Sequence, residues 1–257
     1  NSSASLGRGF EPIVGGPNQP NQVYIDLSTE NQTLTKRDTW DLGFYCGSDF
    51  RVGINSSIYM AVAALESTDI DSVTQADVLE IQDQVAVGTF DPSNIIYIDN
   101  PDGDINKTAI APVSSNDIDN KVYLLNLGYK VGTDSPAPGS IAIAGDTRGW
   151  KKIRILKQNG AYLFQYADIN QSTHQEVLIE KDSDFNFSFF SFDSNTQLDV
   201  EPKAEKWDLN FTVFTNIVTG AGSYGFSDGV LHNRKGGVKA YSILTDEIAY
   251  DDFSSEN

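Results

Sequence analysis

His174 and His232 are the only two histidines in this 257-residue chain. Nucleophilic catalysis needs a base of suitable pKa, most often a histidine, that a third group holds beside the nucleophile. Neither histidine lies in a nucleophile-elbow motif, and the glycine-rich stretch 219–225 lacks the lysine of a phosphate-binding loop. Asp and Glu total 36, but nothing singles out a pair as a glycosidase acid and nucleophile. The residues therefore predict that the protein is not an enzyme.

Oxygen-bearing side chains gather in residues 99–106, Asp-Asn-Pro-Asp-Gly-Asp-Ile-Asn. Hard oxygen ligands on a glycine-containing turn are what a calcium loop uses. The glutamate that closes an EF-hand is absent, however, and ordinary turns are rich in the same residues. We expect an ordinary turn here and keep calcium binding as the less favoured alternative.

The segments that would position these residues occur twice in the sequence, as an internal repeat. The first copy comprises Val23–Leu34, Thr39–Phe44 and Arg51–Asn55, and the second comprises Phe190–Leu198, Lys206–Phe211 and Gly229–Asn233. Both copies read strand, polar turn, strand, Trp-Asp-Leu-x-Phe, loop and a Val-x-x-Asn strand. Trp, Leu and Phe alternate at period two, so Trp40 and Trp207 are expected to anchor the core of each half. An internal duplication is the preferred interpretation, and chance similarity between β-rich segments is the alternative.

The whole pattern predicts a mainly β fold, an antiparallel multi-sheet single domain built from two related halves with one or two short helices. Residues 72–86 fit an amphipathic helix, with Val78, Leu79, Ile81 and Val85 on one face. Asn159-Gly160 between strands 150–156 and 161–166 indicates a type I′ hairpin.

Two further segments carry expectations about the sheets. The strand 185–192 has aromatic residues on both faces, which is typical of a central strand. Lys151, Lys152, Arg154 and Lys157 form a cationic cluster in an acidic chain, which we interpret as a solvated sheet edge. A patch for an acidic partner or a carboxylate ligand is the alternative.

Composition limits the class of protein. A net charge of −18 argues against binding to nucleic acid or to an anionic membrane surface. The lone Cys46 excludes an intramolecular disulfide and a cysteine-based zinc site. Residues 1–22 are rich in Gly, Pro and Asn and are interpreted as a flexible N-terminal arm or tether, and residues 23–257 as a single β domain. A first residue other than Met fits a mature secreted chain.

Several of these motifs together resemble the HmuY-type lipoproteins, which are surface-tethered haem-binding proteins of Gram-negative bacteria. The resemblance rests on Tyr-x-Asp-Leu-Ser-Thr at 24–29, Trp-Asp-Leu-x-Phe at 40–44, Val-x-x-Asn-Ser-Ser at 52–57, Trp-Asp at 207–208 and Val-Leu-x-Asn at 230–233. It covers about residues 23–243 and implies haem capture at the outer membrane and transfer to a TonB-dependent transporter. It also implies a lipid anchor on a cysteine upstream of Asn1. The shared residues are structural framework, so the resemblance does not place the haem ligands.

Chemistry alone nominates the haem-contacting residues. Haem needs axial donors, an apolar slot and usually cations for its propionates. His174 and His232 are nominated as iron ligands, Arg234 and Lys235 as propionate cations, and Tyr224 as a wall of the slot. The alternatives are structural: His174 as an exposed hairpin histidine, His232 as a core position equivalent to Ile54, and Tyr224 as a loop anchor. Met60 is expected in the core.

Two other functions remain open. The chain could serve as a protein-binding subunit of an outer-membrane complex without haem, or as a glycan-binding module that uses exposed aromatic side chains. A haemin titration separates these functions, because axial ligation gives a sharp Soret shift.

Overall fold

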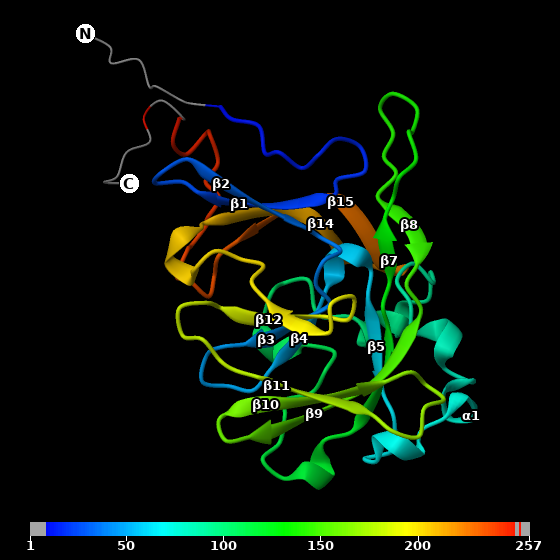
Figure 1. The fold of residues 1–257 in the computed structure, drawn as a ribbon. Helices are drawn as coiled ribbons and strands as arrows, with labels where there is room; N and C mark the ends of the chain where they lie inside the picture. Colours follow the sequence, from blue (N-terminus) through cyan, green and yellow to red (C-terminus); the bar gives the residue numbers. More distant parts are fainter. Residues whose placement is uncertain (1–8, 250–251, 253–257) are drawn as a thin grey trace.

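The structure is a computed structural model that describes residues 9–249 and 252. Three antiparallel sheets are stacked in Figure 1, and a two-stranded sheet stands beside them. The upper sheet has the order β15 (Gly222–His232), β14 (Leu209–Val218), β1 (Asn21–Asp26) and β2 (Asn31–Lys36). The middle sheet has the order β13 (Thr196–Leu198), β12 (Phe187–Ser191), β3 (Leu42–Tyr45) and β4 (Val52–Ile54).

The lower sheet has five strands: β11 (Gln175–Ile179), β10 (Ala161–Ala167), β9 (Trp150–Gln158), β6 (Val122–Asn126) and β5 (Ala61–Ala64). The two-stranded sheet pairs β7 (Tyr129–Val131) with β8 (Ala144–Thr147). All the paired strands run antiparallel, so the predicted mainly β fold is confirmed.

The main core lies between the middle and lower sheets. Phe44 on β3 packs edge-on against Tyr162 and Phe164 on β10, with ring centroids 5.1 and 5.4 Å apart. Leu42, Phe44 and Phe190 are fully buried there, and so is Met60, as expected. Burial of such aromatic side chains is worth about 1.5–3 kcal/mol each, so this interface fixes the middle sheet in place.

The duplicated halves exchange strands. The β1–β2 hairpin of the first half pairs with β14 of the second, and the equivalent β12–β13 hairpin pairs with β3 of the first. The two pairings have the same register. Tyr24 is paired with Asn210, and at the equivalent position Phe189 is paired with Gly43. We call residues 37–57 the Trp40 module and residues 204–236 the Trp207 module. Each of the two sheets thus combines one module with the hairpin of the other half.

The two tryptophans do not lie where alternation placed them. Trp40 and Trp207 are half-buried and pack edge-on against Phe189 and Tyr24, with ring centroids 4.8 and 5.0 Å apart. They precede β3 and β14, which begin at Leu42 and Leu209. Because regular alternation starts only there, neither indole joins Leu42 and Phe44 in the main core, and the expectation that they anchor the core was wrong.

The expected helix over residues 72–86 was also wrong in length. Only α1 (Gln75–Val78) is α-helical, and Thr74 and Asp77 form a capping box at its start. Val78 and Val85 are buried, but Leu79 is 68% exposed, so the four apolar residues do not share a face. Several β-branched residues lower the helix propensity of this stretch.

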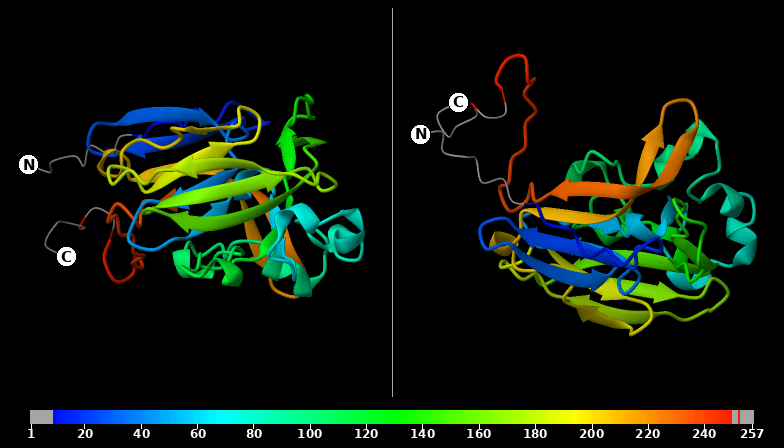
Figure 2. Two further views of the ribbon diagram at one scale, coloured as in Figure 1. Left: turned by 60° about the horizontal axis from the view of Figure 1, so that its bottom comes forward. Right: turned by 90° about the horizontal axis from the view of Figure 1, so that it is seen from above.

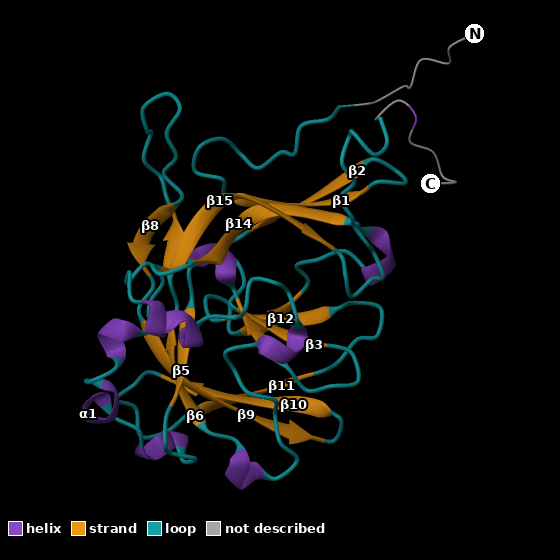
Figure 3. Ribbon diagram, turned by 180° about the vertical axis from the view of Figure 1, so that it is seen from behind, coloured by secondary structure: helices purple, strands orange, loops and turns teal. Residues whose placement is uncertain are grey.

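Short 3₁₀ helices cover the remaining helical residues (Figure 3). They are η1 (Ser56–Ile58), η2 (Ile70–Ser72), η3 (Gln82–Gln84), η4 (Pro92–Tyr97), η5 (Ile105–Lys107), η6 (Asp117–Asp119) and η7 (Ala204–Lys206). Most of them belong to the long connection between β5 and β6. No helix among the described residues is long and apolar enough to cross a membrane.

The Asn159-Gly160 hairpin is confirmed, with positive φ at both residues (51° and 87°). The expectation of a central strand at 185–192 is confirmed, because β12 lies between β13 and β3. The expectation of a solvated edge at Lys151–Lys157 was wrong. Strand β9 lies inside the lower sheet, and Lys152 is fully buried with its ammonium donating to the carbonyls of Val73 and Gln171.

Strands β14 and β15 form a long hairpin where the sequence indicated a loop around Tyr224. The right view of Figure 2 shows this hairpin reaching past β1 and β2 toward the β5–β6 connection. The amide of Gly88 donates to the Ser223 carbonyl there, at 3.0 Å. The division into an arm and one domain stays a prediction, and residues 1–8 of that arm lie outside the described residues.

A cavity between the two tryptophan modules

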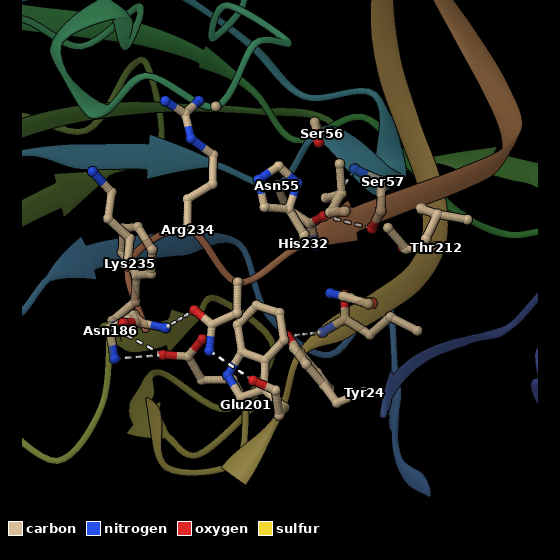
Figure 4. A pocket seen from close by; sticks show the side chains of 18 of the residues that line it. Tyr24, Asn55, Ser56, Ser57, Asn186, Glu201, Thr212, His232, Arg234 and Lys235 are labelled. Carbon is tan, nitrogen blue, oxygen red and sulfur yellow. Dashed lines mark hydrogen bonds between the residues drawn. The ribbon is translucent and has the colours of Figure 1, made fainter. Parts of the chain in front are cut away.

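A cavity of about 470 Å³ lies between the upper and middle sheets (Figure 4). Its aromatic walls come from both halves of the duplication: Tyr24, Trp40, Phe187, Phe189 and Trp207. Because Tyr24 and Phe189 occupy equivalent hairpin positions and pack on the two indoles, the cavity lies between two copies of one motif.

Strand alternation explains which side chains reach this cavity. Gln22 and Tyr24 on β1, and Asn210 and Thr212 on β14, are two residues apart and share the inner face of the upper sheet. Phe187 and Phe189 on β12 do the same from the middle sheet.

Cations from the Trp207 module lie at the margin of the cavity. His232 ends β15, and Arg234 and Lys235 follow it. In Figure 4 these three residues lie along one margin, and Glu201 and Tyr24 lie at the other. The Arg234 guanidinium donates to the Asp102 carbonyl at 2.6 Å, which connects the module to the loop that also lines the cavity. Burial, and next the charge of Arg234, lower the pKa of Lys235.

The imidazole of His232 has no hydrogen-bond partner among the described residues, so its nitrogens are available to a ligand. His232 is equivalent to Ile54, as the sequence predicted. Leu209 is paired with His232 in one module, and Leu42 is paired with Ile54 in the other.

A buried carboxyl group faces the opposite margin. Glu201 is 6% exposed, and its Oε1 accepts from the backbone amides of Asn186 and Phe187 at 2.8 and 2.9 Å. Burial raises the pKa of Glu201 to about 7, although these hydrogen bonds oppose the shift. Burial, and then the nearby Glu201, raise the pKa of Tyr24 well above its ordinary value.

Three buried polar atoms of the lining residues have no partner among the described residues: the indole nitrogens of Trp40 and Trp207 and the side-chain oxygen of Asn210. Unpaired buried polar atoms are rare in folded proteins and call for an explanation. All three atoms belong to residues that line the cavity, where a bound ligand can supply the missing partner.

His174 does not line this cavity. It lies just before β11, where Nδ1 is 2.8 Å from Asp71 and Nε2 is 3.2 Å from Glu176. Burial opposes the charged imidazole, but the hydrogen bonds to Asp71 and Glu176 outweigh it and raise the pKa of His174. An iron atom could bind this imidazole only by displacing one of the two carboxylates.

Tyr224 also lies apart from the cavity, on β15. It is 47% exposed and belongs to a small aromatic cluster with Phe90 and Phe226, at ring distances of 6.2 and 5.7 Å. The structure therefore brings His232, Arg234 and Lys235 together and leaves His174 and Tyr224 elsewhere.

The acidic loop at 99–106 has its carboxylates in use. Asp99 accepts from the amides of Ile54 and Ala109, both at 2.8 Å, and Asp102 lies 2.5 Å from the Lys107 ammonium. Among the described residues no group of three or more His, Cys, Asp or Glu could hold a metal ion. Calcium binding gains no support from these contacts.

The sequence did not single out Phe187, Phe189 or Glu201 as site residues. Phe189 lies just outside the second sequence copy, which begins at Phe190, and only the strand register shows that it occupies the position of Tyr24. Glu201 has no signal in the sequence either, because its role depends on the amides of a strand 14 residues away.

A family model described as HmuY protein matches residues 18–182, which is more than half of the chain. The match ends before the Trp207 module. No curated protein and no solved structure matches the chain. The chain belongs to the HmuY family.

Proposed function

We propose that this protein binds haem at the bacterial cell surface and passes it to a TonB-dependent outer-membrane transporter, without catalysing a reaction. A lipid anchor upstream of Asn1 would hold it at the outer membrane. Membership of the HmuY family supports the ligand class. The cavity between the two modules is the place where we expect the haem.

One observation carries the choice of site. Within the described part of the chain the His232 imidazole has no hydrogen-bond partner, and it lies at the margin of an aromatic cavity with Arg234 and Lys235 next to it in the chain. Haem sites combine such a donor with an apolar slot and cations for the propionates. The cavity volume of about 470 Å³ lies within the usual range for small-molecule sites, about 300–1,000 Å³.

His174 is the weaker of the two iron-ligand candidates, because Asp71 and Glu176 hold both of its nitrogens. Tyr224 would contact haem only if the ligand lay on the outer part of β15. Both roles in haem binding stay predictions, and the haemin titration described next tests that of His174.

The test is a haemin titration of the full chain, followed by the Soret band. We expect a sharp shift that saturates at one equivalent, a weakened or altered band for His232→Ala, and an unchanged band for His174→Ala. Loss of the band with His174→Ala alone would move the site to the lower sheet. A featureless rise in absorbance for the unmodified protein would contradict haem binding and favour a protein-binding role.

Glycan binding keeps one supporting observation, the exposed aromatic cluster of Phe90, Tyr224 and Phe226. A glycan array with Tyr224→Ala as the control examines this second candidate. Binding that the substitution abolishes would support it.

A further inference from the structure

A second, smaller cavity of about 190 Å³ adjoins the first one. It is lined by Trp40, Gly43, Gly53, Phe187, Phe189 and the loop 99–108. Trp40 and the two phenylalanines line both cavities, but His232 and Trp207 line only the larger one. The smaller cavity therefore belongs to the Trp40 module.

Two glycines create this space. Gly43 on β3 faces Gly53 on β4, whereas the equivalent positions of the Trp207 module hold Asn210 and Leu231. A Cβ atom on Gly43 would come within 3.4 Å of the Phe187 and Phe189 rings, and one on Gly53 within 3.1 Å of the Asp99 carboxylate. The side chains that fill this position in one module are absent in the other.

The aromatic wall is continuous. Phe189 packs edge-on against Trp40 at 4.8 Å and lies 6.1 Å from Phe187. The faces of such rings carry partial negative charge and attract cations, most strongly for tryptophan.

The loop opposite these rings contributes carboxylates. Asp99 is held by two backbone amides and has no cationic partner among the described residues, and burial raises its pKa to about 6. Asp104 lines the cavity as well. The Lys107 ammonium lies 2.5 Å from Asp102 and 3.9 Å from Asp104, and Arg234 reaches the Asp102 carbonyl, so neither cation pairs with Asp99.

We propose that the smaller cavity binds the ammonium group of an organic amine. A cation would meet three aromatic rings and supply the counter-charge that Asp99 lacks, which relieves the unfavourable burial of its ionised form. An anion would be repelled, and a neutral apolar group would leave Asp99 uncompensated. The net charge of −18 also attracts cations to the whole molecule. The ammonium could come from a free amine or from a lysine side chain of a partner protein.

The test uses calorimetric titration of the full chain at constant ionic strength, with tetramethylammonium and n-butylammonium as probes. The neutral analogues tert-butanol and 1-butanol are the matched ligands. We expect saturable binding of at least one ammonium probe, at least tenfold tighter than its neutral analogue. Equal affinity for the charged and neutral members of each pair, or no saturable binding, would overturn the proposal.

The duplication supplies a matched pair of variants. Trp40→Leu should weaken ammonium binding at least fivefold, and Trp207→Leu, the equivalent change outside this cavity, should leave it unchanged. Gly43→Ala fills the cavity without removing an aromatic ring and should weaken binding as well, which covers a failure of Trp40→Leu to fold. Equal losses for the two tryptophan variants would contradict the proposed place.

A peptide with one lysine identifies the source of the ammonium. Tighter binding than n-butylammonium indicates a protein partner, and weaker binding indicates a free amine. Since His232 lies outside this cavity, His232→Ala should abolish axial haem ligation and leave ammonium binding intact, so the two proposals fail separately.

Discussion

Asn55 and Asn233 make the same hydrogen bonds in the two halves of the chain. The Asn55 amide donates to the Asp41 carbonyl at 2.9 Å, and the Asn233 amide donates to the Asp208 carbonyl at 2.8 Å. The Nδ2 group of Asn55 donates to the Trp40 carbonyl at 2.8 Å, and that of Asn233 to the Trp207 carbonyl at 2.9 Å. The same Nδ2 groups also donate to the carbonyl three positions before the tryptophan, that of Arg37 or Ala204, in both cases at 2.7 Å. These shared bonds show that the duplicated sequence builds one structural unit twice.

Replacing either asparagine should destabilise the protein by a similar amount. Asn55 and Asn233 are 0% and 1% exposed, and Asn→Ala leaves several backbone groups unpaired. We expect a loss of about 2–4 kcal/mol in the free energy of unfolding for each variant. Urea denaturation measures it, and Asn31→Ala on the exposed surface should change it by less than about 0.5 kcal/mol. An Asn233→Ala variant whose free energy of unfolding is unchanged would contradict the equivalence of the modules.

The Arg148–Asp41 ion pair should contribute strongly to stability. Their side chains are 3% and 0% exposed, and Asp41 also accepts from the Phe192 amide at 2.7 Å. Removing one partner of a buried pair leaves an uncompensated charge, so Arg148→Met should cost about 3–5 kcal/mol. The exposed pair Lys203–Asp184 is the control, and Lys203→Met should cost far less, because solvent screens an exposed pair. A similar loss for both variants, measured by denaturation, would rule out the special role of the buried pair.

Glu201 should make stability fall as pH rises. Its pKa is about 7 in the folded protein and 4.5 ordinarily, so the unfolded chain releases this proton first. The protonated carboxyl group therefore contributes about 3 kcal/mol to the free energy of unfolding below pH 4.5. This contribution is lost as the pH rises through 7. Glu201→Gln removes this loss, so the variant should gain stability relative to the unmodified protein between pH 4.5 and 8. Denaturation across this range measures the difference, with Glu205→Gln at an exposed position as the control.

Much of the fold could be predicted because each repeated residue has a local role. The Trp-Asp-Leu-x-Phe and Val-x-x-Asn patterns mark β3, β4, β14 and β15, and their repetition predicts two related halves. The exchange of hairpins could not be predicted, because strand pairing over more than 140 residues leaves no mark in local periodicity. The same limit explains the wrong interpretation of β9, since a lysine-rich strand reads as an edge until its neighbours are known.

The candidate site was predictable only in part. His232, Arg234 and Lys235 are neighbours in sequence, so finding them together needed no tertiary information. Whether His174 joins them depends on which sheets approach each other, and the structure places His174 beside Asp71 instead. The aromatic walls escaped prediction because alternation assigned Trp40 and Trp207 to the core, whereas their strands begin two residues later.

Crystals of the full chain soaked with haemin, measured at the iron absorption edge, address the central proposal most directly. Our account predicts an anomalous peak within bonding distance of a His232 nitrogen, with the porphyrin between the upper and middle sheets and its propionates near Arg234 and Lys235. Iron bound at His174 or against Tyr224, with the cavity between the two tryptophan modules empty, would contradict it.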